Sequence, residues 1–264
     1  MPIYPNHTKR QLAAGELALG IVLRQSRTVD IAAISRTCGF DWMSIDMEHG
    51  SLGLDTAAQI ANAALAVGIT PIVRVPGKEH YHASRLLDAG AQGVIVPHVD
   101  SAEEARAAVN ACKYPPIGRR SLASTQPLLA FESVPSEEAM RLVNEETILI
   151  AMLESPDAIA QVDEIAAVPG IDVLLIGTGD LAAEMGIPGK LTHPRIEDAY
   201  RRMIDACLKH KIQAGMAGIH DAEFGARLVD YGVRFITAGT DLNFLMAGAR
   251  QRTGLLRGLL KPSG

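Results

Sequence analysis

The feature that most limits how this chain can fold is an alternation of eight short apolar runs with segments of helical pattern. The apolar runs are Ala18–Leu23, Asp41–Asp46, Thr70–Val75, Gly93–Val96, Thr147–Leu153, Val173–Ile176, Ile212–Ala217 and Val233–Thr237. Strands buried on both faces have this continuous apolar character, and strand–helix alternation favours a parallel sheet. Because no interdomain linker interrupts the 264 residues, we predict an α/β fold, a single (β/α)8 TIM barrel spanning residues 1–264.

The segments between these runs carry apolar residues at helical spacing, and several end at glycine. The predicted helices are Thr8–Ala14, Val29–Thr37, Asp55–Val67, Tyr81–Ala89, a helix capped by Ser101 and Glu104 that runs through Ala111, Ser136–Asn144, Pro156–Ala167, Leu181–Met185, Pro194–His210, Asp221–Asp230 and Asp241–Leu260. A long polar connection, Lys113–Glu146, contains the short acidic helix near Ser136. Connections of this length inside a compact domain are more often functional than idle.

Composition excludes several classes of partner. The net charge is −5 and the basic residues are scattered, so we expect neither nucleic acid nor an acidic membrane as a partner. The three cysteines, Cys38, Cys112 and Cys207, lie far apart without metal-binding spacing and are interpreted as reduced thiols. No run approaches the roughly 20 apolar residues of a membrane span, and the N-terminus lacks an apolar signal core. We therefore expect a soluble cytoplasmic protein.

Acidic residues follow two consecutive predicted strands. Glu154 follows Ile148–Leu153, and Asp180 follows the run that ends at Ile176. In a parallel barrel these strand ends lie side by side, so the two carboxylates would converge where a hard divalent cation finds oxygen ligands. Gly177 and Gly179 leave room for a small anion beside the N–H groups that open the next helix. The alternative is that Glu154 and Asp180 only cap helices.

Other strand ends carry polar residues as well. Asp46 and His49 could form a dyad in which Asp46 orients His49 and His49 moves protons near neutral pH, although a solvated loop is the alternative. Arg74 ends the third predicted strand, where a buried guanidinium needs an anionic partner. His98 after the fourth strand is as consistent with packing as with a site.

A lysine-based Schiff-base mechanism needs a desolvated lysine aimed into the barrel. None of the seven lysines falls within a predicted strand, and only Lys78 lies in a loop at the carboxyl ends of the strands. The chain also lacks a GxSxG elbow and a P-loop, and Gly177–Asp180 is too short for a dinucleotide fingerprint. Covalent catalysis through lysine is therefore disfavoured.

Six motifs together resemble the HpcH/HpaI family, the metal-dependent class II pyruvate aldolases. They are Ile45–Gly50, Val73–Pro76, Leu86–Pro97, Tyr114–Arg120, Met152–Glu154 and Ile176–Leu181, and they occur in the family's order between about Gly15 and Arg250. The resemblance implies a TIM barrel of the phosphoenolpyruvate/pyruvate-domain type. It also implies a homo-oligomer, usually a hexamer built as a trimer of dimers, whose C-terminal helix packs on a neighbouring subunit.

The resemblance also implies roles for individual residues. Glu154 and Asp180 would bind the metal, which is Mg²⁺, Mn²⁺ or Co²⁺. Arg74 would hold the pyruvate oxygen, and His49 with Asp46 would be the acid/base dyad. The substrate-binding residues would be Arg74, Met152, Gly177, Thr178, Gly179 and Asp180, with the backbone after Gly177 taking the pyruvate carboxylate.

Two positions depart from the family pattern. Met152 stands where many members carry Gln, and Val22 stands where many carry an aromatic residue and is soon followed by Arg24. We expect both positions to line the pocket, so they bear on the substrate rather than on the chemistry.

The function expected from these observations is retro-aldol cleavage of a 4-hydroxy-2-oxo acid to pyruvate, or a close 2-oxo acid analogue, and an aldehyde. Oxaloacetate decarboxylation through the same enolate is one alternative. An acyl-CoA lyase of the citrate lyase β type is another, although its N-terminal pattern is absent. A non-catalytic oxo-acid-binding paralogue is disfavoured by the intact set of Arg74, Glu154 and Asp180.

Overall fold

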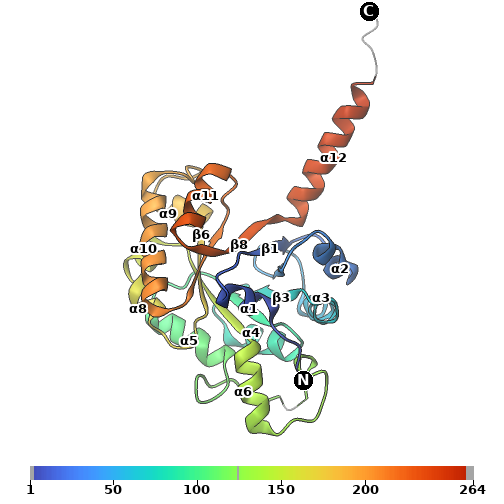
Figure 1. The fold of residues 1–264 in the computed structure, drawn as a ribbon, viewed down its shortest axis with the longest axis vertical. Coiled ribbons are helices and arrows are strands. Elements are labelled where there is room, and N and C mark those ends of the chain that lie inside the picture. Colours follow the sequence, from blue (N-terminus) through green and yellow to red (C-terminus); the bar gives the residue numbers. More distant parts are fainter. Residues whose placement is uncertain (1–2, 124, 260–264) are drawn as a thin grey trace, which may run out of the picture.

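The computed structural model describes residues 3–123 and 125–259, and its centre is a closed barrel of eight parallel strands that pair in sequence order (Figure 1). The strands are β1 (Ala18–Leu23), β2 (Trp42–Asp46), β3 (Thr70–Arg74), β4 (Gly93–Val96), β5 (Ile148–Leu153), β6 (Val173–Gly177), β7 (Gln213–Ala217) and β8 (Val233–Thr240). The predicted TIM-type barrel is confirmed for the part of the chain that the structure describes.

Most of the helices lie around the barrel and connect one strand to the next. The first precedes β1 and the last follows β8. The helices are α1 (His7–Ala13), α2 (Asp30–Thr37), α3 (Leu54–Val67), α4 (His80–Asp88), α5 (Ala102–Cys112), α6 (Ser136–Glu146), α7 (Pro156–Ala160), α8 (Val162–Ala166), α9 (Thr178–Glu184), α10 (Pro194–His210), α11 (Ala222–Tyr231) and α12 (Asp241–Arg257), with a short 3-10 helix at Pro127–Leu129. The prediction of one helix over Pro156–Ala167 is wrong, because Gln161 leaves the helical region at φ −100° and ψ 15° and separates α7 from α8. Leu260, the predicted end of the last helix, lies outside the described residues.

The barrel interior is packed with apolar side chains rather than open. The indole of Trp42 stacks on Phe235 with ring centroids 4.1 Å apart, and its N–H donates to the carbonyl of Ala18 at 3.2 Å. Gly20 is required beside this ring, because a Cβ there would lie 2.1 Å from Trp42. The core thus fixes the strands from which the site residues project.

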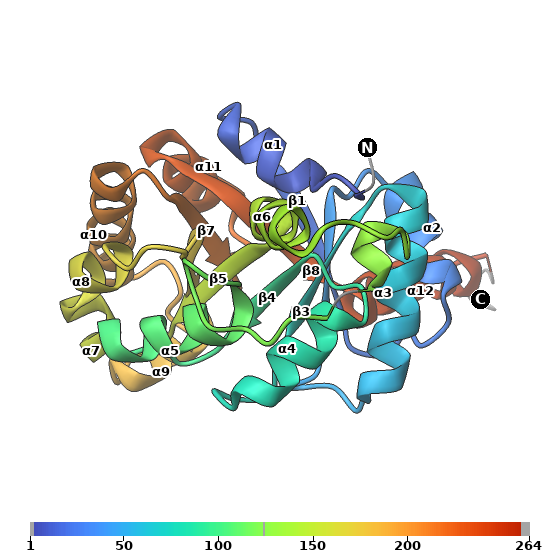
Figure 2. The same cartoon turned by 90° about the horizontal axis from the view of Figure 1, so that it is seen from below.

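The amino ends of the strands are covered by α1 and α6, which cross that end of the barrel in Figure 2. Lys113 is buried here, and its ammonium donates to the carbonyl of Thr147 at 2.5 Å and to Asp172 at 3.0 Å. Because Thr147 and Asp172 directly precede β5 and β6, this buried lysine lies at the end of the barrel opposite the predicted site.

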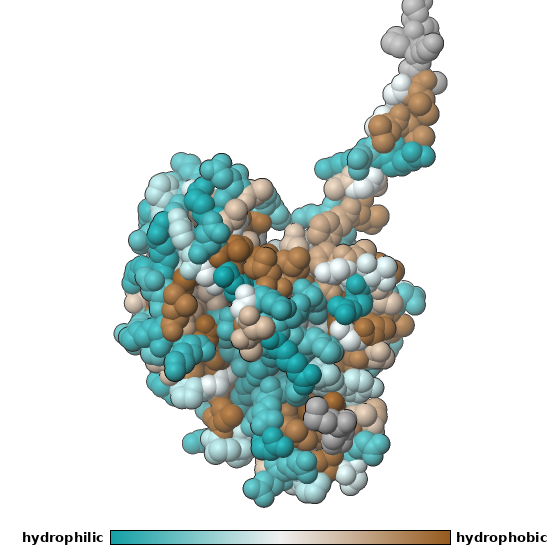
Figure 3. Space-filling model, in the orientation of Figure 1, coloured by the Kyte–Doolittle hydropathy of each residue, from teal (hydrophilic) through white to brown (hydrophobic). Residues whose placement is uncertain are grey.

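Helix α12 leaves the barrel and projects outward (Figure 1). None of its residues is buried, and apolar side chains lie along it (Figure 3). The large exposed ones are Phe244, Leu245, Met246, Leu255 and Leu256. Within residues 3–123 and 125–259, no helix has both the length and the apolar character needed to cross a membrane.

Candidate active site

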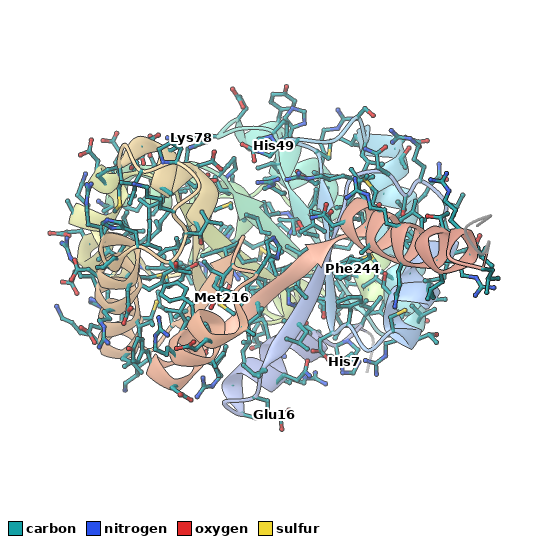
Figure 4. All side chains as sticks on the ribbon, turned by 90° about the horizontal axis from the view of Figure 1, so that it is seen from above. His7, Glu16, His49, Lys78, Met216 and Phe244 are labelled. Atoms are coloured by element: carbon teal, nitrogen blue, oxygen red, sulfur yellow. The ribbon has the colours of Figure 1, made fainter. Side chains whose placement is uncertain are left out.

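A cavity of about 270 Å³ lies among the carboxyl ends of the strands. It is lined by eight residues that the sequence predicted for the site or its pocket, Val22, His49, Arg74, Met152, Gly177, Thr178, Gly179 and Asp180, together with Arg24, Ser44, Ile95, Leu175, Ala217, Gly218, His220, Thr237, Gly239, Thr240 and Asn243. Figure 4 looks down on the side of the molecule from which α12 leaves, with His49 near one edge and Phe244 at the base of the helix.

Arg74 is held by a fully buried carboxylate. Its Nε donates to Asp46 Oδ1 at 2.9 Å and its Nη2 donates to Asp46 Oδ2 at 2.6 Å, so the guanidinium and the carboxylate form a bidentate ion pair. Its Nη1 lies 2.9 Å from Glu48 Oε2. Burial alone would raise the pKa of Asp46, but the hydrogen bonds and charge of Arg74 hold it below its usual value. Asp46 is therefore ionised, and Arg74 has little freedom to turn.

The same contacts explain why the structure does not form the predicted Asp46–His49 side-chain dyad. Asp46 Oδ1 accepts the backbone N–H of His49 at 3.2 Å and that of Glu48 at 3.1 Å, so the carboxylate closes the turn after β2. The His49 ring is half exposed, and its Nε2 lies 4.0 Å from Glu48 Oε2. His49 lines the cavity, and Asp46 holds its backbone N–H rather than its ring.

Glu154 is not itself among the residues that line the cavity; it is almost fully buried, at 1% exposure, and lies beside Gly177, which does line it. Its Oε2 accepts the backbone N–H of His98 at 3.0 Å, while the side chain of Ser155 caps α7 through the N–H of Ala158 at 3.0 Å. The alternative that Glu154 only caps a helix is thus wrong. A Cβ at Gly177 would lie 2.6 Å from Glu154 Oε1, so glycine at this position keeps space around the carboxylate.

Asp180 is not a helix cap either. It is the third residue of α9, which begins after Gly177, and it is exposed to the cavity. The hydroxyl of Thr178 is engaged, because it donates to the carbonyl of Ala217 at 2.6 Å and contacts the hydroxyl of Tyr200 at 2.7 Å. The hydroxyl of Thr178 is therefore committed to contacts within the protein.

The electrostatics of Glu154 and Asp180 fit a cation. Burial raises the pKa of Glu154 to about 7, the charges of Asp180 and Glu48 add to that rise, and the N–H of His98 opposes it. A divalent cation between Glu154 and Asp180 would stabilise both carboxylates. Among the described residues no group of three or more His, Cys, Asp or Glu is arranged to hold a metal ion. Glu154 and Asp180 are a pair of carboxylates. Such a pair suits Mg²⁺-like ions, which keep waters or substrate oxygens as their other ligands.

Sequence reasoning missed the roles of Arg24, Glu48 and His98. Arg24 Nε donates to Asp46 Oδ2 at 2.9 Å, so two arginines share one carboxylate. A usable signal existed for Arg24, because it directly follows β1, just as Arg74 ends β3. His98 had a comparable signal, because it closely follows β4, and its backbone N–H and its ring Nδ1 lie 3.0 and 3.5 Å from Glu154 Oε2.

Comparison with known proteins decides the family. The protein-family model described as HpcH/HpaI aldolase/citrate lyase matches residues 22–247 of the chain. The chain belongs to this family. This HpcH/HpaI chain is 36% identical to a 4-hydroxy-4-methyl-2-oxoglutarate aldolase of Hapsidospora irregularis, over 96% of each protein. It is 34% identical to a pyruvate aldolase of Rhizobium etli, over 94% of this chain and 96% of the relative.

A solved structure shows the same fold. The HpcH/HpaI aldolase from Desulfitobacterium hafniense superposes with a TM-score of 0.91 at 28% identity, covering 97% of this chain and 98% of that one. The predicted family is confirmed, and with it the prediction of a carbon–carbon lyase.

Proposed function

We propose that the protein is a divalent-metal-dependent class II aldolase that cleaves a 4-hydroxy-2-oxo acid to pyruvate, or a close 2-oxo acid analogue, and an aldehyde. The names of the relatives support aldol chemistry on 2-oxo acids. The observation that carries the proposal is that Arg74 and Asp180 line one cavity and that the carboxylate of Glu154 lies directly beside Gly177, which lines the same cavity.

In the proposed reaction the C3–C4 bond breaks and its electrons pass to the C2 oxygen, which becomes an enolate oxygen. A Mg²⁺, Mn²⁺ or Co²⁺ ion held by Glu154 and Asp180 would supply positive charge to the 2-oxo acid oxygens. Arg74, fixed by Asp46, donates to the enolate oxygen as its charge develops. A donor that is already oriented needs no reorganisation at the moment of reaction.

Two proton transfers complete the cleavage. His49 takes the proton of the 4-hydroxyl as the aldehyde forms and releases it to solvent, and C3 of the enolate takes a proton from solvent water to give pyruvate. The half-exposed ring of His49 at the cavity supports this assignment. The backbone N–H groups at the start of α9 bind the carboxylate of the 2-oxo acid, and Met152 packs beside it in the cavity.

The quaternary structure and location belong to the proposal as well. The uncovered apolar residues of α12 support packing on a neighbouring subunit within a homohexamer. A cytoplasmic location stays a prediction.

The test is a panel of 4-hydroxy-2-oxo acids assayed for pyruvate and for the carbonyl product in the presence of Mg²⁺, Mn²⁺ or Co²⁺. We expect equimolar release of both products from at least one compound. Oxaloacetate serves as the comparison substrate, because its decarboxylation needs the enolate but yields no aldehyde. Turnover of oxaloacetate without cleavage of any 4-hydroxy-2-oxo acid would contradict the aldolase proposal.

A further inference from the structure

We propose that Arg24 is a specificity-determining residue that binds a second carboxylate, carried by the part of the substrate that leaves as the carbonyl product. The inference rests on the proposed function and assigns to Arg24 the discrimination between 4-hydroxy-2-oxo acids that end in a second carboxylate, as in the substrate named for the Hapsidospora irregularis relative, and those that do not. It depends on where Arg24 lies, on which of its nitrogens are free, and on how the rest of the cavity is lined.

Arg24 lies across the barrel from Glu154. In the closed order β1 to β8, the strand opposite β1 is β5, and these two strands lead to Arg24 and Glu154. Arg24 shares Asp46 with Arg74, on the side of the barrel away from the start of α9, so a 2-oxo acid with its first carboxylate at α9 has its far end on the side of Arg24. That end of the substrate carries the fragment released by cleavage of the C3–C4 bond.

The guanidinium of Arg24 has unused donors at the cavity. Only its Nε makes a hydrogen bond among the described residues, to Asp46 Oδ2, while Nη1 and Nη2 make none there. The side chain is 35% exposed and lines the cavity. Asp46 is its only ion-pair partner in the described chain, and Asp46 also accepts two hydrogen bonds from Arg74. The two NH₂ groups of Arg24 lie in one plane, and their spacing matches that of the two oxygens of a carboxylate.

Arg24 is also held in place before any ligand arrives. Asp241, the first residue of α12, accepts the backbone N–H groups of Arg24, Gln25 and Ser26 at 3.0, 3.0 and 2.7 Å. The main chain is thus fixed by Asp241 and the side chain by Asp46. An arginine restrained at both ends loses little conformational freedom when it binds a ligand, so more of its interaction energy is available for discrimination.

The neighbouring lining favours an anion. The β8 side of the cavity offers the polar residues Thr237, Thr240 and Asn243. Asp180 is the only acidic residue among the lining residues that the structure describes, and we assign it to the metal. A substrate with a carboxylate at each end would therefore meet a cation or N–H donors at both ends.

The experiment compares two substrates of equal chain length, 4-hydroxy-2-oxoglutarate, which ends in a carboxylate, and 4-hydroxy-2-oxopentanoate, which ends in a methyl group. We expect the wild type to favour the diacid in kcat/KM by about 10-fold or more. In Arg24→Gln, the amide nitrogen occupies the position of Nε and can still donate to Asp46, but the two Nη groups are gone. The preference should fall by about 10- to 100-fold, chiefly through KM for the diacid, as expected for loss of a hydrogen bond to a charged group.

Arg27→Gln is the matched control. It removes the same charge from the same loop, but Arg27 is exposed, contacts Ser51 and does not line the cavity. Its substrate preference should equal that of the wild type. If Arg24→Gln does not fold, Arg24→Lys replaces it, and a single ammonium should retain only part of the preference for the diacid.

Equal wild-type efficiency on the two substrates, or an equal loss on both in Arg24→Gln, would overturn the inference and make Arg24 a positioning residue for Asp46, while the aldolase proposal would stand. Failure of the wild type to cleave either substrate or any other 4-hydroxy-2-oxo acid would instead overturn the proposed function, and this inference with it.

Discussion

At the scale of single residues, one buried carboxylate positions the two arginines that line the cavity. Asp46 binds Arg74 through two hydrogen bonds and Arg24 through one, and it also accepts two backbone N–H groups of its own turn. Its role is therefore to fix the direction in which two guanidinium groups point. A residue of this kind acts on the reaction through the arginines it holds.

Arg74→Lys tests whether this fixed direction matters. Lysine keeps a positive charge, but it cannot form the bidentate contact with Asp46, so the donor to the enolate oxygen loses its orientation. We expect kcat to fall by roughly two orders of magnitude or more, as for loss of an oxyanion donor. Steady-state kinetics with thermal unfolding as a control for folding would measure it. Near-normal turnover would show that Arg74 is only a structural ion-pair partner.

His49→Ala separates proton transfer from enolate formation. If His49 takes the proton of the 4-hydroxyl, aldol cleavage should fall by about 10²- to 10⁴-fold, the usual range for general acid–base catalysis. Oxaloacetate decarboxylation needs Arg74 and the cation but no such relay, so its rate should fall much less. Both rates are measured on the same preparation. An equal loss of the two activities would place His49 in support of the metal site or the enolate.

At the scale of elements, the sequence predicted what parallel strands determine and missed what side-chain packing determines. Arg74, Glu154 and Asp180 were found because the carboxyl end of every strand lies on one face of a barrel. The partner of Asp46 depends on side chains from β1, β2 and β3 together, so the spacing of Asp46 and His49 alone gave a dyad that the structure does not form. The break between α7 and α8 was missed because Gln161 is an ordinary helix former.

Helix α12 carries a prediction of its own. It has 17 residues, none of them buried, whereas helices in proteins draw most of their stability from packing an apolar face. Replacing Leu245 and Leu255 together with Gln should therefore lower the molar mass of the assembly, as measured by light scattering after size exclusion. Arg252→Gln, on the same helix, is the control and should leave the mass unchanged. A monomeric wild type, or an unaffected double variant, would contradict packing of α12 on a neighbour.

At the scale of the whole molecule, the two carboxylates lie outside the apolar core, although Ile95, Met152 and Leu175 of that core also line the cavity. The apolar cluster inside the barrel, around Trp42 and Phe235, holds the strands without help from Glu154 or Asp180. A metal at the two carboxylates would therefore be needed for chemistry and not for folding. Removal of the metal should affect activity and leave the fold intact, which distinguishes this site from a structural metal centre.

Chelation by EDTA should accordingly abolish pyruvate release, while circular dichroism shows the barrel still folded, and added Mg²⁺, Mn²⁺ or Co²⁺ should restore activity. In a parallel sample, borohydride added with pyruvate should leave the protein mass unchanged. The reason is that Lys78 lies outside the cavity with its ammonium 2.6 Å from Glu104, and Lys113 is buried at the other end of the barrel. Full activity in a metal-free sample, or a reduced pyruvate adduct on Lys78, would replace the metal mechanism with a Schiff base.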